Sequence, residues 1–416
     1  MKNYTGFLIR RERLRQNLSQ EGLCRGICAV SYLSKIEQGL VTPGAEILEQ
    51  LFRALGIRYL DDPALLKRAK AELRAFFERF FLYVLKKEDG AWLDERQSDL
   101  ANSSLDLSMH LFHLYRAAYA DDQEAMKAEI QALDPFVSYL SDDQLFLYHF
   151  GRALLRGDDG ARENAFLNAQ RLCPCACVQY HRADFDFMRG RYVQAAQEAE
   201  HAYQLAADEG NGYIMLYAST LLGMSYANQH HYPFMMRYFR RALALSQSLS
   251  PDFAGQVLYN IGATCLELHR YDEALTALNA SLEYPFEDDA SALLTYHKLA
   301  IVHTQLGNEE EARAFLAKAE ALCTPEMPGI YRRILRAAKM RLRPDHLSDP
   351  EYTALLRTIY DESEETLHFG FKQFHGFFLI EAYAHQRRYK DALAVSREIS
   401  EFSFNTLIST DEQDVL

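Results

Sequence analysis

Three polar residues at helical spacing carry the first chemical signal in this sequence. Ser31, Ser34 and Lys35 lie in residues 30–38, where they face away from the apolar residues Leu33 and Ile36. Hydroxyl and ammonium groups can hydrogen-bond to the base edges that the major groove of DNA exposes. We therefore expect these three residues to contact bases, and the neighbouring Val30 to contact a thymine methyl group.

Two short helices joined by a turn would present this polar face. Ser19 is a good N-cap for a helix that starts at Gln20, and residues 26–29 supply the turn. The second helix ends at Gly39, which suits the left-handed position after a helix. The segment predicts a helix-turn-helix, and the apolar residues that would close its small core are Leu18, Leu23, Ile27, Leu33 and Ile36.

Basic and polar residues beside this helix are expected to bind the phosphate backbone. Gln20 and Tyr32 occupy helix N-terminal positions, where side chains reach phosphates. Arg10, Arg11 and Arg15 lie on a first helix predicted over residues 5–16. The alternative is that some of these residues only solvate the surface.

The charge of the chain separates a cationic head from an anionic body. Residues 1–58 contain nine Lys and Arg and five acids, a net charge of +4. The whole chain carries −13, so the other 358 residues carry −17. Only the head is suited to phosphate, and the body should be repelled by DNA.

Other classes of protein are disfavoured by what the sequence lacks. It has no long apolar run and no apolar N-terminal segment, so we expect a cytoplasmic protein with no membrane span. Phosphate-loop, zinc-protease and serine-hydrolase motifs are absent, so we predict no enzyme, no catalytic residue and no cofactor. Cys173, Cys175 and Cys177 with His181 lack a second ligand pair, which favours packed thiols over a metal site or a redox sensor.

From about residue 100 the chain is predicted to form helix pairs, with a period of 34–40 residues. The clearest unit, residues 258–285, places Gly262, Tyr271, Ala274 and Pro285 close to the spacing of a tetratricopeptide repeat. Residues 181–202, 221–243, 298–322 and 382–399 repeat parts of it. Stacked pairs form a continuous core and a curved inner surface. The fold class is thus all-α: a lambda-repressor-like helix-turn-helix domain followed by a tetratricopeptide-repeat superhelix.

The inner surface of such an array can bind an extended peptide. With the glycine of a repeat counted as position eight, helix positions two, five, nine and thirteen face inward. Amide side chains there bond a peptide backbone without regard to its sequence. The peptide-binding candidates are Asn228, Gln256, Tyr259, His297 and Gln305. The alternative for each is an ordinary solvated inner face.

The head resembles that of the RNPP receptors, Gram-positive regulators that sense imported signalling peptides. The resemblance is carried by residues 26–28, 31–37 and Gly39, and by the Gln20-to-Gly39 spacing of an Xre-type head. The body resembles the family only in its architecture of degenerate tetratricopeptide repeats. The resemblance implies a buried ion pair between Arg13 and Glu37. It also implies a homodimer whose repeats hold a short peptide and change the arrangement of the heads.

We therefore expect a peptide-responsive transcription regulator that binds a double-stranded operator. One alternative is an adaptor whose repeats capture a protein partner, such as a response regulator, with DNA binding secondary. Another is a constitutive repressor whose repeats only dimerise. The predicted divisions are 1–60 for the head, 61–90 for a linker helix, 91–405 for the repeats and 406–416 for an acidic tail.

Overall fold

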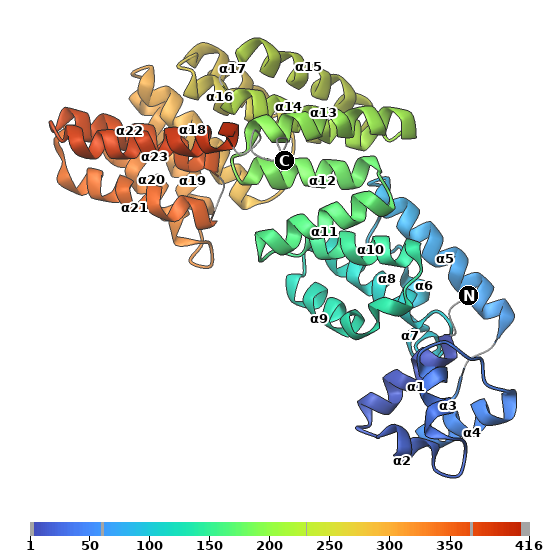
Figure 1. The fold of residues 1–416 in the computed structure, drawn as a ribbon. Coiled ribbons are helices and arrows are strands. Elements are labelled where there is room, and N and C mark those ends of the chain that lie inside the picture. The colour runs from blue at the N-terminus through green and yellow to red at the C-terminus, as the bar shows by residue number, and fades with distance from the viewer. Residues whose placement is uncertain (1–3, 60–61, 230, 367–368, 409–416) are drawn as a thin grey trace. The chain divides into compact units, whose positions relative to one another are not determined.

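The computed structural model describes residues 4–59, 62–229, 231–366 and 369–408, and within these ranges the chain forms helices and no strands (Figure 1). The predicted all-α class is therefore confirmed. The chain divides into two compact units, Met1–Val178 and Gln179–Leu416. The helix α12 (Ala176–Met188) spans this division. The predicted acidic tail lies largely outside the described residues.

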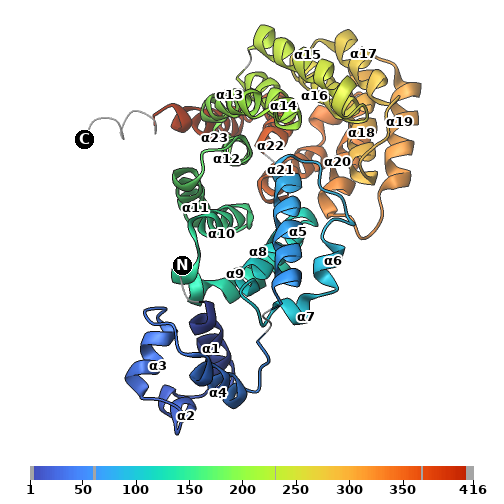
Figure 2. The same ribbon diagram turned by 90° about the vertical axis from the view of Figure 1, so that its right-hand side faces the viewer.

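The first unit begins with a four-helix head (Figure 2). Its helices are α1 (Tyr4–Arg15), α2 (Gln20–Cys24), α3 (Val30–Glu37) and α4 (Ala45–Leu55). The Ser19 hydroxyl accepts a hydrogen bond from the Gly22 amide at 2.9 Å, which caps α2 as predicted. Gly6 lets α1 approach the end of α3, because a Cβ atom there would lie 1.9 Å from the carbonyl oxygen of Ile36.

The rest of the first unit consists mainly of a long helix and two helix pairs. Its elements are α5 (Pro63–Phe81), α6 (Ala91–Asp94), α7 (Gln97–Leu100), α8 (Asp106–Tyr119), α9 (Gln123–Leu133), η1 (Asp134–Tyr139), α10 (Asp142–Leu154) and α11 (Asp159–Leu172). The Phe76 ring of α5 contacts Phe112 of α8 with 4.7 Å between centroids, and Phe80 lies equally close to Tyr115. The phenylalanine stripe of α5 therefore packs on α8. The helix ends at Phe81, before the end of the linker helix predicted over residues 61–90, and Tyr83 then adopts a left-handed backbone with φ of 59°.

The second unit is a succession of helix pairs. Its elements are α13 (Tyr192–Glu209), α14 (Gly212–Asn228), α15 (Tyr232–Leu249), α16 (Phe253–Glu267), α17 (Tyr271–Ser281), α18 (Asp289–Gln305), α19 (Glu309–Leu322), α20 (Gly329–Arg341), η2 (His346–Ser348), α21 (Pro350–Thr366), α22 (Phe369–His385) and α23 (Tyr389–Ile408). At Gly262 of α16 a Cβ atom would lie 2.5 Å from Leu278 of α17. The repeat glycine thus permits the close helix crossing that the sequence predicts.

No helix in the described part of the chain is long and apolar enough to cross a bilayer.

Candidate DNA-reading helix and repeat-domain pocket

Helix α3 presents an exposed polar face. Val30 is 42% exposed, and Ser31 and Lys35 are also exposed. Ser34 is half-buried and its hydroxyl accepts a hydrogen bond from the Gln38 amide at 3.1 Å. Tyr32 is half-buried at the start of the helix. A short helix that exposes small polar groups and one ammonium has the form that a major groove accepts.

A buried ion pair fixes α3 to α1. Arg13 donates through Nε to Glu37 Oε1 at 2.6 Å and through Nη2 to Oε2 at 2.9 Å. Arg13 Nη1 also donates to the Leu18 carbonyl at 2.8 Å. Glu37 is 2% exposed, and its hydrogen bonds raise the pKa of the Arg13 guanidinium. The pair lies where the family resemblance implied it, and its bidentate geometry orients the reading helix.

Arg11 and Arg10 were predicted to bind phosphate, but their side chains contact other residues of the first unit. Arg11 forms an ion pair with Asp106 of α8 at 2.5 Å and donates to the Ala101 carbonyl at 2.9 Å. Arg10 lies 3.4 Å from the Tyr139 hydroxyl. The phosphate prediction is wrong for Arg11, and Arg10 also turns toward the body. The reason is that residues 91–139 cover this side of α1, which the local sequence does not reveal.

Of the other phosphate candidates, Gln20 is engaged inside the head, whereas Arg15 is exposed. The Gln20 amide donates to Glu37 Oε2 at 2.7 Å, so it completes the buried ion pair rather than facing outward. The side chain of Arg15 is 70% exposed and pairs with Glu12 of its own helix. Of the three α1 arginines predicted to bind phosphate, Arg15 is thus the one that remains a candidate.

The head contacts three residues of the first unit that the sequence analysis did not single out: Phe136, Tyr139 and Asp106. The Phe7 ring of α1 packs edge-on against Phe136 of η1, with centroids 4.8 Å apart. The Tyr139 hydroxyl donates to the carbonyl of Glu37, the last residue of α3. Asp106 is 3% exposed and faces Arg11. The only sequence signal was an acidic residue at the start of an apolar helix, which is too common to single out.

Replacing Arg11 by alanine is expected to lower stability without changing how DNA binding depends on salt. Asp106 would be left buried without its guanidinium, which costs about 1–3 kcal/mol. A phosphate contact would instead contribute about one unit to the slope of log affinity against log salt. Urea unfolding and a salt titration of duplex binding measure the two effects. A reduced salt slope with unchanged stability would contradict the observed role of Arg11.

The predicted peptide-binding residues are distributed over α14, α16 and α18. Gln256 is exposed and Tyr259 is half-buried. The Asn228 amide donates to the Met224 carbonyl of its own helix at 2.9 Å, which occupies one of its donors. Gln305 is half-buried and lines a pocket. Of the five candidates, Gln305 alone lines this pocket.

His297 is not available to a peptide, so the prediction for this residue is wrong. It is 1% exposed, and its ring stacks on His375 of α22 with 5.9 Å between centroids. The next residue, Lys298, is 3% exposed and places Nζ 3.1 Å from the centroid of Phe374. The reason is that α22 packs against α18, so part of the inner space is filled by the protein's own side chains.

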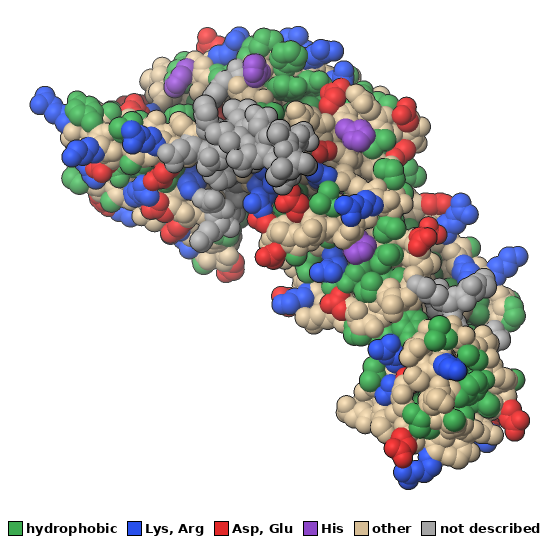
Figure 3. Space-filling view, in the orientation of Figure 1, with side chains coloured by type: hydrophobic (Ala, Val, Ile, Leu, Met, Phe, Trp, Pro, Cys, Tyr) green, Lys and Arg blue, Asp and Glu red, His purple; other side chains and the backbone are tan. Residues whose placement is uncertain are grey.

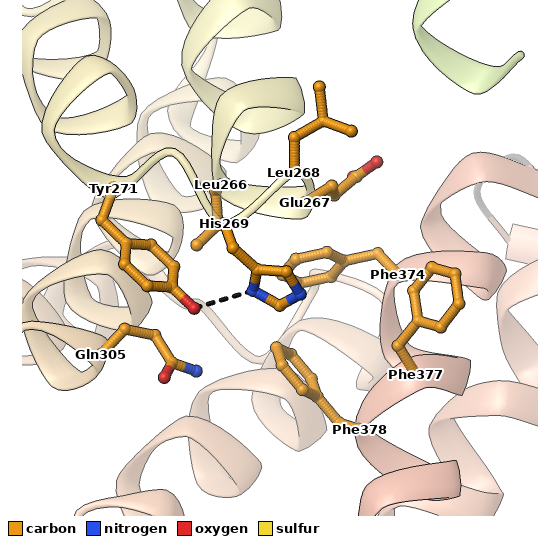
Figure 4. A pocket seen from close by; sticks show the side chains of 9 residues that line it. All are labelled: Leu266, Glu267, Leu268, His269, Tyr271, Gln305, Phe374, Phe377 and Phe378. Atoms are coloured by element: carbon orange, nitrogen blue, oxygen red, sulfur yellow. Dashed lines mark hydrogen bonds between the residues drawn. The ribbon is translucent and has the colours of Figure 1, made fainter. Parts of the chain in front are cut away.

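Beside this filled region lies a pocket of about 280 Å³ (Figure 4). It opens between the turn that joins α16 to α17 and the helix α22. Phe374, Phe377 and Phe378 form one wall, and Gln305 of α18 lies near Tyr271. The Tyr271 hydroxyl is hydrogen-bonded to His269 Nδ1 at 2.8 Å. The remaining lining residues are Leu266, Glu267 and Leu268.

The two stacked histidines predict that the second unit loses stability in mild acid. Burial lowers the pKa of His375 to about 3 and that of His297 well below its usual value, with Lys298 nearby adding to both shifts. The unfolded chain therefore binds protons near pH 6.5 that the folded chain does not. The stability is present above that pH and is lost as the pH falls from 6.5 toward 3.

We expect the free energy of unfolding to fall by about 1 kcal/mol per histidine for each pH unit below 6. Urea midpoints of wild type and His375→Phe at pH 6.5 and 5.5 measure this loss. The variant should show the smaller loss. As a control, replacing the exposed His201 by glutamine should leave the loss unchanged. Equal losses in wild type and His375→Phe would contradict the prediction.

The seven cysteines lie outside disulfide bonds, and no group of three or more His, Cys, Asp or Glu within the described ranges is placed to hold a metal ion. His110 Nδ1 of α8 lies 2.7 Å from Glu129 Oε2 of α9.

Comparison with known families matches both parts of the chain. A helix-turn-helix profile matches residues 9–61, and a tetratricopeptide-repeat profile matches residues 253–324. The chain joins a helix-turn-helix domain to tetratricopeptide repeats. Both domain types are those predicted from the sequence. A sequence comparison with curated proteins finds no match.

Solved structures share the fold of this helix-turn-helix and repeat protein. The apo form of the quorum sensor NprR from B. thuringiensis is 17% identical with a TM-score of 0.62, over 81% of this chain and 99% of the solved NprR chain. NprR in complex with its cognate peptide NprX is 17% identical with a TM-score of 0.59, over 80% and 98%. A Rap protein complexed with Competence and Sporulation Factor is 12% identical with a TM-score of 0.65, over 82% and 99%. At these identities the likeness establishes the fold.

Proposed function

We propose that this protein is a DNA-binding transcription regulator whose repeat domain binds a short signalling peptide. The proposal of DNA binding rests on the exposed polar face of α3, which the buried ion pair between Arg13 and Glu37 holds in place. The charge distribution supports it, because the head alone is cationic in an otherwise anionic chain.

The peptide-binding part is supported by the fold and by the pocket. The repeats share the fold of NprR, which has been solved with the peptide NprX. The pocket beside α22 offers aromatic walls together with the polar groups of Gln305 and Tyr271. Peptide grooves combine such side-chain pockets with groups that bond the peptide backbone. Because α22 fills part of the inner space, we infer that a peptide enters at this pocket and not along the whole inner surface.

We infer that the regulator acts as a homodimer. A single head buries little groove surface, and two heads on a palindromic operator multiply affinity and set the half-site spacing. Peptide binding would regulate DNA binding by stabilising one arrangement of the two heads more than another.

Selection of duplexes from a random pool by the full-length protein tests the DNA-binding part. We expect a palindromic sequence to be enriched and to bind at least about a thousandfold more tightly than unrelated duplex at the same salt concentration. No enrichment would contradict DNA-sequence recognition.

The operator so obtained then allows the peptide part to be tested. Operator affinity and sedimentation are measured with and without peptides from a randomised heptapeptide pool. A change in either quantity supports regulation by a peptide. Peptides that bind and change neither quantity would contradict the proposed switch.

A further inference from the structure

The pocket beside α22 places a carboxylate among aromatic rings. Phe374, Phe377 and Phe378 face the turn that carries Glu267 (Figure 4). Phe377 is 43% exposed, so this wall can be reached from solvent. A pocket of about 280 Å³ is at the small end of ligand sites, enough for one long side chain but not for a whole peptide.

The Glu267 carboxylate lacks a hydrogen-bond donor within the described part of the chain. Its nearest cation is Lys298, whose Nζ lies 3.9 Å from Oε1, beyond hydrogen-bond distance. The Glu267 side chain is 32% exposed, so part of it faces the pocket. Burial raises the pKa of Glu267, and the charge of Lys298 opposes this shift. A second donor group beside the carboxylate would therefore be favourable.

One of these rings, Phe374, already lies against a cation. The Lys298 ammonium lies 3.1 Å from the centroid of Phe374 and 5.9 Å from that of Phe371. Positive groups over aromatic faces are attracted by the negative charge of the ring face, and more strongly where water is excluded. The wall is thus suited to positive groups, whereas an anion would be repelled by Glu267.

We propose that this pocket binds a cationic group of a linear peptide, with Glu267 as the counter-charge and the rings of Phe374, Phe377 and Phe378 around it. The group is the guanidinium or ammonium of an arginine or lysine side chain, or the ammonium of the peptide amino terminus. This proposal rests on the proposed function, since it names the chemistry of the peptide.

Gln305 supplies the next contact along the peptide. It lies near Tyr271, and its amide forms no hydrogen bond with another described residue. An amide both donates and accepts, so Gln305 can bond the peptide backbone beside the cationic group. The net charge of the body favours the approach of such a peptide. The face seen in Figure 3 carries acidic and basic side chains interspersed.

Fluorescent heptapeptide pools test the proposal on the full-length protein. Each pool fixes one position as Arg, Lys, Leu or Glu, and each is made with a free or an acetylated amino terminus. Fluorescence anisotropy measures binding. We expect pools with a fixed Arg or Lys to bind roughly tenfold more tightly than Leu pools, as one charge-assisted contact provides. If the fixed residue makes no difference and acetylation weakens every pool by about this factor, the bound cation is the amino terminus.

Glu267→Gln keeps the size of the side chain and removes its charge. The variant should lose the preference for cationic pools and keep its affinity for Leu pools. Glu273→Gln is the matched control, because Glu273 belongs to the neighbouring helix and pairs with Arg270 outside the pocket. Phe377→Leu, at a half-exposed position, should weaken the binding of cationic pools by a smaller factor.

The outcomes separate the two proposals. Pools that bind without a preference for a cation, or a preference that survives Glu267→Gln, would overturn the pocket assignment and leave peptide binding intact. If no pool binds at all, both peptide binding and the pocket assignment are overturned.

Discussion

Replacing Arg13 by methionine should unfold the helix-turn-helix head at moderate temperature. The change removes both hydrogen bonds that Glu37 receives from the guanidinium and leaves that carboxylate 2% exposed with only the Gln20 amide as donor. Removal of one partner from a buried ion pair costs about 3–5 kcal/mol. That loss is a large fraction of the total stability of a small domain.

Hydrogen exchange of the α3 amides measures this loss directly in the full-length chain. We expect their protection to fall toward that of an unfolded segment, and operator binding to fall with it. The double variant Arg13→Met with Glu37→Met should recover part of the stability, because an apolar pair leaves no charge buried. As a control, Arg53→Ala removes an exposed pair with Glu49 and should cost at most about 1 kcal/mol. Normal α3 protection in Arg13→Met would show that the ion pair does not hold the head.

Replacing Lys35 by alanine should weaken operator binding more than the loss of any other exposed charge from the head. Lys35 is exposed on α3, where no ion pair with another described residue competes for its ammonium. A contact to a guanine edge is worth about 1–3 kcal/mol per half-site, and both half-sites lose it in a dimer. Binding to the selected operator is measured by anisotropy at several salt concentrations.

The salt series also decides what Lys35 contacts. If it reads a base, sequence preference relaxes at one position of each half-site and the salt slope is little changed. If it binds phosphate, all sequences weaken together and the slope falls by about one per contact. Lys70→Ala, at an exposed position on α5, removes the same charge outside the reading helix. Equal effects of the two substitutions would contradict a role for Lys35 in reading DNA.

The contacts between the head and the first helix pairs bear on regulation. Arg11 with Asp106, Phe7 with Phe136, and Tyr139 with the Glu37 carbonyl join α1 and α3 to α8 and η1. These three contacts connect this part of the first unit to the reading helix. A peptide that altered this unit would therefore act on the head through these contacts, and variants at Asp106 or Tyr139 are natural probes of that coupling.

Local features of this protein were predictable from sequence because they depend on neighbours in the chain. The Ser19 cap, the α3 face with Ser31 and Lys35, and the repeat glycine at Gly262 each follow from helix periodicity or local sterics. The all-α class and the two domain types follow from the same periodicity summed over the chain.

Only the tertiary structure decided which of these surfaces are free. From the local sequence, Arg11 was predicted to lie on an exposed face of α1. In the structure residues 91–139 cover that face, and Asp106 forms an ion pair with Arg11. His297 was predicted to face the inner surface, but helix α22 packs His375, 78 residues further along the chain, against it. Periodicity defines the faces of a helix, whereas the element that covers each face depends on long-range packing that one sequence does not encode locally.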